Sequence, residues 1–110
     1  MGVTAANDVV LALTTLGNPA QARELVQRLV DQRLIACGTI VPGATSVYRW
    51  QGKVTAEDEV VVLLKTRKDS WDALKAAVEA HHPYEVPELV AIPVVDGLKP
   101  YLDWVASETS

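Results

Sequence analysis

The sequence predicts a mixed α/β fold of the α+β class, formed as a single domain over residues 1–110. Short apolar runs alternate with two amphipathic helical segments, and no linker or low-complexity stretch divides the chain. The length of 110 residues is that of one ordinary domain. Apolar residues make up 49% of the chain and charged residues 22%, which is typical of a globular protein and not of a disordered one.

The N-terminal part predicts a strand followed by a helix. Val9–Leu13 is an unbroken apolar run, as expected of a strand that is covered on both faces. Asn18 and Pro19 then begin a helix, because Asn caps free N–H groups and proline suits the first helical position. Apolar residues recur at helical spacing from Ala22 to Leu34, which indicates one face packed on the sheet.

The middle of the chain predicts a long β-hairpin. Ile35–Val41 reads as a strand that breaks at Pro42-Gly43, and Thr45–Gln51 continues as extended chain. A turn at Gly52-Lys53 leads to another strand at Glu59–Thr66, again apolar on both faces. In a domain of this size, part of such a hairpin must project beyond the sheet.

The last third predicts a helix, a strand and a short final helix. Asp69 or Ser70 is expected to cap the first helix, which runs to about His81. Leu89–Val95 follows as a strand, in which a proline lacks the N–H needed for a central position and therefore favours an edge or a bulge. Pro100 opens the final helix.

This order of elements predicts a ferredoxin-like βαββαβ sandwich with an extended β-hairpin and a short C-terminal helix. The two crossover helices are expected on one face of the sheet. The exposed strand edges of the hairpin, together with Tyr48 and Trp50 on one of its sides, favour association with further copies of the chain.

Charge and hydropathy exclude several classes of partner. The net charge of −4 and the scattered Lys and Arg residues argue against nucleic-acid binding. No apolar run approaches the ~18 residues needed to span a bilayer, so we expect no membrane segment. Met1–Asp8 lacks the basic and apolar regions of a signal peptide, which predicts a cytoplasmic protein.

The segment around His81 and His82 is the strongest chemical cluster in the sequence. Neutral imidazole is a common ligand of copper and zinc, and Tyr84, Glu85 and Glu88 supply oxygen donors nearby. The alternative is structural: both histidines cap the helix and one packs under the sheet. Adjacent helical positions point about 100° apart, which disfavours joint binding of one ion unless the helix has frayed.

Other chemically capable residues have simpler interpretations beside functional ones. Cys37 is a small buried hydrophobe or a soft copper ligand. Glu57-Asp58-Glu59 is a solvated turn or a cation attractor. No nucleophile–base pair, phosphate loop or zinc spacing is present, so we expect no enzyme.

Taken together, these residues resemble the CutA divalent-cation tolerance proteins. The resemblance runs from about Asp8 to Val105, and the order and spacing of the motifs agree with the family. The matching segments are Ala36-Cys37, Pro42–Lys53, Glu59, Lys65-Thr66, His81–Leu89 and Tyr101–Trp104.

The resemblance implies a ferredoxin-like fold assembled as a homotrimer, with the hairpins pairing between subunits. It also implies a link to divalent-metal tolerance, notably of copper, with His81 and His82 as the metal residues. Some members carry a cysteine where this chain has Thr14, which is a poor copper ligand. No enzymatic activity is implied.

Three functions therefore remain open. The first is a trimeric protein of metal tolerance and response to metal ions that binds copper or another divalent metal. The second is a small-molecule sensor similar to PII signalling proteins, with a ligand cleft between subunits lined by Tyr48, Trp50, Lys65 or Tyr84. The third is a purely structural trimer with incidental metal contacts.

Overall fold

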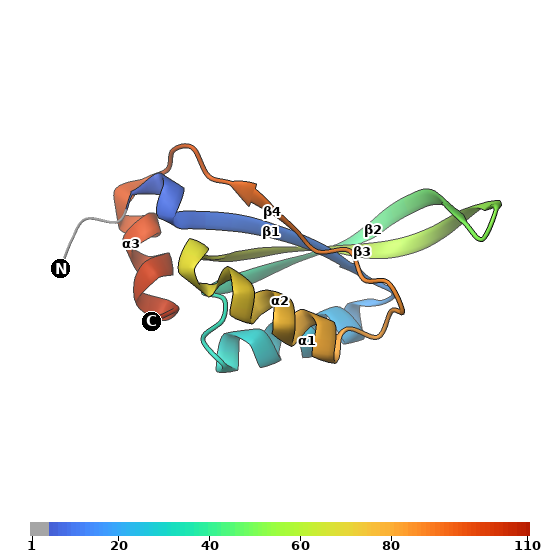
Figure 1. Cartoon of the computed structure of the whole chain (residues 1–110), viewed down its shortest axis with the longest axis horizontal. Coiled ribbons are helices and arrows are strands. Elements are labelled where there is room, and N and C mark those ends of the chain that lie inside the picture. Colours follow the sequence, from blue (N-terminus) through green and yellow to red (C-terminus); the bar gives the residue numbers. More distant parts are fainter. Residues whose placement is uncertain (1–4) are drawn as a thin grey trace.

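The computed structural model describes residues 5–110, so the start of the N-terminal segment Met1–Asp8 lies outside the described residues. Its four-stranded sheet has the order β2-β3-β1-β4, with every neighbouring pair antiparallel (Figure 1). This is the strand order of a ferredoxin-like fold, so the predicted fold class is confirmed. The elements are η1 (Ala6–Asp8), β1 (Val9–Leu16), α1 (Pro19–Asp31), β2 (Cys37–Trp50), β3 (Lys53–Arg67), η2 (Lys68–Ser70), α2 (Trp71–His81), β4 (Val90–Pro93) and α3 (Lys99–Glu108).

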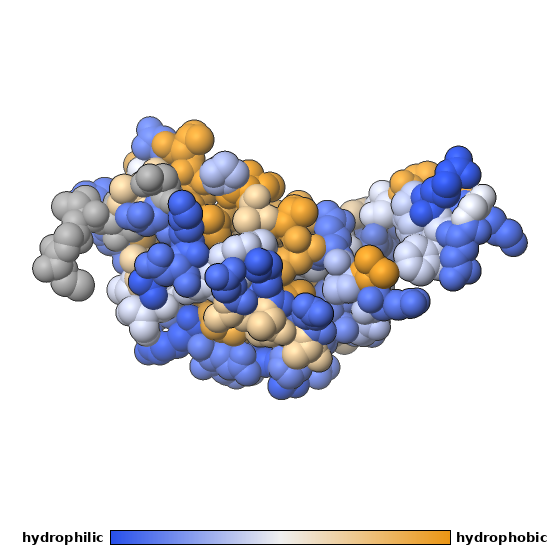
Figure 2. Space-filling model, viewed as in Figure 1, coloured by the Kyte–Doolittle hydropathy of each residue, from blue (hydrophilic) through white to orange (hydrophobic). Residues whose placement is uncertain are grey.

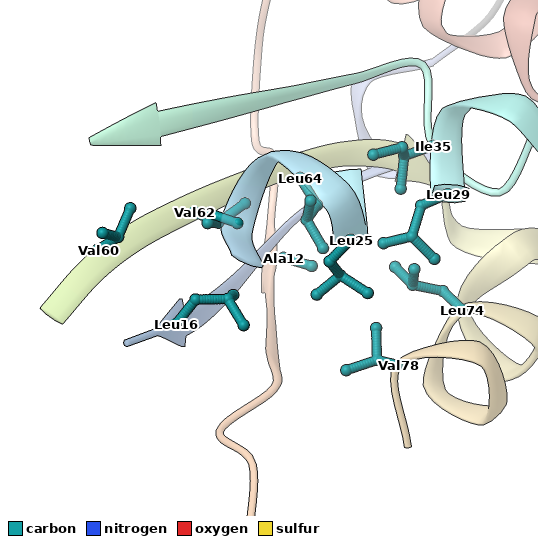
Figure 3. Packing of buried hydrophobic residues seen from close by; sticks show 11 residues of the cluster. Ala12, Leu16, Leu25, Leu29, Ile35, Val60, Val62, Leu64, Leu74 and Val78 are labelled. Atoms are coloured by element: carbon teal, nitrogen blue, oxygen red, sulfur yellow. The ribbon is translucent and has the colours of Figure 1, made fainter. Parts of the chain in front are cut away.

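Helices α1 and α2 cover one face of the sheet and bury an aliphatic core against it (Figure 3). Alternate residues of the central strands β1 and β3 point into this core, as the period of two requires. The predicted cap of α1 is confirmed, because the Asn18 side chain accepts a hydrogen bond of 2.8 Å from the Gln21 N–H. The buried members are Ala12, Leu16, Ala22, Leu25, Leu29, Ile35, Val60, Val62, Leu64, Leu74 and Val78.

Helix α3 packs against the beginning of β1 and forms a second, smaller cluster with Val9, Leu102 and Val105. Val9 alternates with the core-facing residues of β1, so α3 covers one end of the sheet face opposite α1 and α2. Arg67 anchors the helix end by donating hydrogen bonds to the Thr109 hydroxyl at 3.0 Å and the Thr109 carbonyl at 2.8 Å.

Two details of the last third differ from the sequence prediction. The 3-10 turn η2 precedes α2, and Ser70 at the helix N-cap makes no side-chain capping bond. The last strand, β4, spans only the four residues Val90–Pro93, whereas the prediction of Leu89–Val95 gave it seven. It lies at the sheet edge, as predicted from the missing N–H of Pro93.

The hairpin of β2 and β3 projects beyond the sheet, as predicted (Figure 1). Its length makes the molecule 51 Å long and raises the radius of gyration to 14.7 Å, above the roughly 13 Å of a compact chain of this size. At Pro42-Gly43 the strand does not break; the register shifts between Val41 and Ala44 instead. The hairpin turns at Gln51 and Gly52, one residue earlier than predicted, because Lys53 already pairs with Trp50. Their φ values of 49° and 82° are typical of a type I′ turn.

The interpretation of Glu57-Asp58-Glu59 as a solvated turn is wrong. All three residues lie within β3, which begins at Lys53, and they pair with residues 44–46 of β2. Strand β3 therefore starts six residues earlier than the sequence prediction. The first part of β3 lies in the projecting hairpin, where its residues are mostly exposed and polar. It therefore lacks the apolar pattern that identified the buried part of the same strand.

The sheet face opposite α1 and α2 carries an apolar surface that extends beyond α3. Leu11, Leu13, Val61 and Leu63 are half-buried there. At the edges of this face Val41, Val90 and Ile92 are 43%, 47% and 43% exposed, and Figure 2 shows hydrophobic residues gathered on the side of the molecule where β4 runs. We call these seven residues the open sheet face. Within residues 5–110, no helix is both long and apolar enough to cross a membrane.

Candidate functional site

The two adjacent histidines point into different environments. His82 is only 8% exposed. Its Nδ1 accepts a hydrogen bond of 3.1 Å from the Tyr84 N–H, so by assignment from this network its Nε2 carries the proton and donates to the Thr15 carbonyl at 2.8 Å. His81 is exposed and lines a small hollow with Glu24 and Arg28 of α1. His82 is therefore buried and bonded against β1, as one part of the structural alternative expects, while His81 is exposed at the surface.

Cys37 does not join the histidines. It lies opposite Lys65 across the β2–β3 ladder, with Lys65 Nζ 3.6 Å from its Sγ, and Lys65 in turn pairs with Leu11 of β1. His82 instead contacts Thr15. Thr15 follows Leu11 by four residues along β1, which corresponds to about 13 Å at the rise of a strand. Among the side chains of the described residues, no group of three or more His, Cys, Asp or Glu could hold a metal ion. A metal site at His81 and His82 stays a prediction.

A cleft of about 620 Å³ opens where the hairpin leaves the sheet. Apart from Val47, the lining side chains of β2 and β3 share one face of the hairpin and form one wall, and the segment after α2 forms the other. The cleft combines carboxylates, aromatic rings, hydroxyl groups and two valines. Its lining residues are Thr15, Ser46, Val47, Tyr48, Trp50, Thr55, Glu57, Glu59, Tyr84, Glu85, Val86 and Glu88.

Glu59 forms the charged base of this cleft. Its side chain is buried, with 8% of the residue exposed, and its Oε2 accepts a hydrogen bond of 2.9 Å from the Tyr84 hydroxyl. Burial alone would raise the pKa of Glu59, but hydrogen bonds from Ser46, Tyr84 and Thr15 outweigh it and lower the pKa below its ordinary value. Glu59 is therefore ionised at neutral pH.

Tyr84 links the segment after α2 to this carboxylate. Burial, and then the hydrogen bond to Glu59 and its charge, raise the pKa of the Tyr84 phenol to about 12. The ring also packs edge-on against His82, with centroids 4.7 Å apart and an interplanar angle of 68°. The hydroxyl thus stays protonated and donates, and the contacts of His82 and Tyr84 fix the wall of the cleft.

Part of this arrangement was predictable from the sequence. Tyr48, Trp50 and Tyr84 line one cleft within the single chain, whereas the predicted ligand cleft lies between subunits and stays a prediction. Lys65 lies away from this cleft, opposite Cys37. Glu59 was missed as a site residue because the acidic triplet was assigned to a turn. The signal that could have found it is alternation, since Glu59 continues the two-residue period of Leu63 and Val61 out of the apolar strand.

Comparison with known proteins identifies the family. A family model described as "CutA1 divalent ion tolerance protein" matches residues 10–108, nearly the whole chain. The chain belongs to the CutA1 family. Its relatives include the divalent-cation tolerance protein CutA of Thermus thermophilus, which is 46% identical over 99 residues that cover 90% of this chain and 96% of the relative.

Solved CutA1 structures share the same fold over nearly their entire length. CutA from Xylella fastidiosa superposes with a TM-score of 0.91 at 40% identity, covering 94% of this chain and 99% of that one. The Archaeoglobus fulgidus protein, described as a periplasmic divalent cation tolerance protein, superposes with a TM-score of 0.90 at 31% identity, covering 93% and 99%. The role shared by these relatives is therefore divalent-cation tolerance, and the CutA1 family is not a known enzyme family.

Proposed function

We propose that this CutA1 protein acts in divalent-cation tolerance as a homotrimer in the cytoplasm, without nucleic-acid or membrane partners. The observation that supports assembly is the open sheet face, where Val41, Val90 and Ile92 are each more than 40% exposed in a single chain. Such a contiguous apolar surface favours burial against further copies of the chain. The hairpin adds an unpaired strand edge along β2, which is an outer strand of the sheet.

Assembly is tested by light scattering coupled to size-exclusion chromatography. The wild type is expected to elute with three times the mass of the chain. A charged double variant at the sheet edge, Val90→Glu/Ile92→Glu, should dissociate the trimer, whereas Val30→Glu should leave it intact. Val30 is a matched control because it is 40% exposed on α1, on the opposite side of the sheet. A wild-type monomer at micromolar concentration would overturn the proposal.

For direct metal binding, we propose copper or another divalent cation as the ion and His81 as the member of the histidine pair that receives it. His81 is exposed beside the Glu24 carboxylate, while both ring nitrogens of His82 already form hydrogen bonds. Arg28 in the same hollow opposes a cation, and the residues of one chain do not complete a metal site. Any further donors must come from solvent or from another subunit.

Calorimetric titration with Cu(II) separates the two histidines. His81→Ala should abolish the binding heat. His82→Ala should retain it while lowering thermal stability, because that substitution removes a buried ring with two hydrogen bonds. Equal binding by wild type and His81→Ala would remove His81 from consideration. Cell fractionation tests the compartment: recovery in the cytoplasmic fraction is expected, and recovery in a periplasmic fraction, the compartment named for the Archaeoglobus relative, would overturn that part of the proposal.

The cleft supports a second candidate, a PII-like sensor of small molecules. Its volume of about 620 Å³ lies in the range of pockets that bind small ligands. A purely structural trimer would require no such cleft. Thermal-shift measurements with a metabolite library distinguish the candidates, because a sensor is stabilised by a ligand whose effect disappears when Tyr48 and Trp50 are replaced.

A further inference from the structure

The loop between β4 and α3 contains Asp96-Gly97, the only place in the sequence where glycine follows an aspartate or asparagine. Both residues are exposed, and the flanking Val95 and Leu98 are 91% and 79% exposed. The pairing of β4 with β1 ends at Pro93, so within residues 5–110 no strand partner holds the main chain of this dipeptide. The loop lies at the end of the molecule opposite the hairpin and outside the open sheet face (Figure 1).

The side chain of Asp96 lies against the main-chain nitrogen of the next residue. The Gly97 N–H donates a hydrogen bond of 2.8 Å to Asp96 Oδ1. The carboxyl carbon Cγ is bonded to that oxygen, so it lies close to the roughly 3–3.5 Å at which reacting atoms are poised for attack. Glycine permits this approach, because it has no side chain that would shield the nitrogen. A bond between this nitrogen and Cγ would close a five-membered ring.

Other aspartates of the chain lack this combination. The side chain of Asp72 is 94% exposed, but it lies in the first turn of α2 and is followed by Ala73. Asp58 lies within β3 and is followed by the buried Glu59. Exposure alone therefore does not distinguish Asp96. The loop backbone, the following glycine and the contact of 2.8 Å distinguish it together.

We propose that Asp96 is a site of spontaneous isoaspartate formation in the folded protein. The Gly97 nitrogen forms a bond to Cγ of the neutral Asp96 carboxyl, and its proton leaves with the carboxyl hydroxyl as one water molecule. A second water then opens the cyclic imide. Cleavage of the N–Cγ bond restores aspartate, whereas cleavage at the main-chain carbonyl of Asp96 gives isoaspartate. Both reacting atoms belong to adjacent residues, so the step needs water but no access for a larger molecule.

The product changes the connection into α3. Isoaspartate adds one carbon atom to the main chain and leaves a free α-carboxylate, which is the group that isoaspartyl methyltransferases methylate. A Cβ on Gly97 would already lie 3.2 Å from the side chain of Leu102, so the main chain has little room to shift there. Leu102 packs with Val105 on Val9, and the added carbon should loosen this cluster. The inference goes beyond metal tolerance and does not depend on metal binding.

The test is incubation of the folded wild type at physiological temperature and mildly acidic pH, followed by digestion. Isoaspartyl methyltransferase and a labelled methyl donor then quantify isoaspartate in each separated peptide. We expect isoaspartate at residue 96, formed at a rate within about tenfold of that in the urea-unfolded chain, because one hydrogen bond of the native loop must break. Asp72 provides the matched control within the same digest and should remain aspartate.

Two variants at the exposed position 96 separate ring closure from other sources of the signal. Asp96→Glu should abolish it, because the longer side chain would have to close a six-membered ring. Asp96→Asn should form the same imide with loss of ammonia and convert to aspartate and isoaspartate. A yield at Asp96 no higher than at Asp72, or a signal that survives Asp96→Glu, would overturn the inference. An Asp96→Asn variant that keeps its amide in the folded state while losing it in urea would also overturn it.

Discussion

Removing one oxygen atom from the cleft tests its central interaction. Tyr84→Phe keeps the aromatic ring and its contact with His82 but deletes the hydroxyl that donates to Glu59 at 2.9 Å. A hydrogen bond to a charged acceptor contributes about 1.5–3 kcal/mol, and its loss leaves a buried carboxylate less solvated. Because Tyr84 is only partly buried and water can replace some of the bond, we expect a loss of about 1.5 kcal/mol.

The loss should depend on pH in a defined direction. Glu59 has a pKa below its ordinary value of 4.5 in the folded protein, so its interactions stabilise the fold above that value. The stabilisation disappears as pH falls through the lowered folded-state pKa, because the protonated carboxyl accepts a weaker bond. The difference in unfolding free energy between wild type and Tyr84→Phe should therefore be largest near neutral pH and shrink as pH falls below the ordinary Glu59 pKa of 4.5.

Guanidinium unfolding followed by circular dichroism measures this difference at fixed protein concentration, which matters for an oligomer. Tyr101→Phe is the matched control: Tyr101 is 43% exposed, and among residues 5–110 none of the side-chain hydrogen bonds, such as that of the Tyr84 hydroxyl, involves the hydroxyl of Tyr101. Its removal should change stability by less than about 0.5 kcal/mol. If the two variants lose the same stability, or if the Tyr84→Phe effect is independent of pH, the account of Glu59 is wrong.

Three further predictions follow from packing and titration. Gly38→Ala should destabilise by about 1–3 kcal/mol, because the new Cβ would lie 2.6 Å from a Val26 methyl group; adding Val26→Ala should recover part of the loss in the same unfolding assay. Thr14→Val should stabilise by about 1 kcal/mol, because the Thr14 hydroxyl is fully buried and has no hydrogen-bond partner among residues 5–110; an unchanged or lower melting temperature would contradict this. In an absorbance titration one tyrosine should ionise at a pH of about 12, and Glu59→Gln should bring that pKa down, because the variant lacks the charge that raises it.

The elements that the sequence predicted well are those with a strong local signal. Helix α1 begins where Asn18 and Pro19 indicated and buries the apolar stripe that includes Leu25 and Leu29. Strand β4 lies at the edge, as the proline within it required. These features depend on capping, on backbone donors and on periodicity, all of which are written in a few consecutive residues.

The features that were missed depend on residues far apart in the chain. Nothing next to Glu59 in sequence shows that Thr15 and Tyr84 surround it, and charge alone argued for a solvated turn. The histidine pair shows the same limit. The family resemblance implied one metal site for both histidines, whereas adjacent helical positions argued against joint binding of one ion. The helix ends at His81 and His82 has extended backbone, so the two side chains lie in different surroundings.

The contrast between His82 and Glu59 bears on which part of the molecule meets a ligand. His82 uses both ring nitrogens to tie the segment after α2 to β1. That tie holds Tyr84 against Glu59, so the histidine positions the cleft wall without entering it. His82→Ala should then weaken ligand binding in the cleft as well as stability, whereas His81→Ala should affect neither. If metal binding and binding of a small molecule in the cleft are both measured on the two variants, the two sites separate, because His81 is proposed to contact the metal and His82 only positions the wall of the cleft.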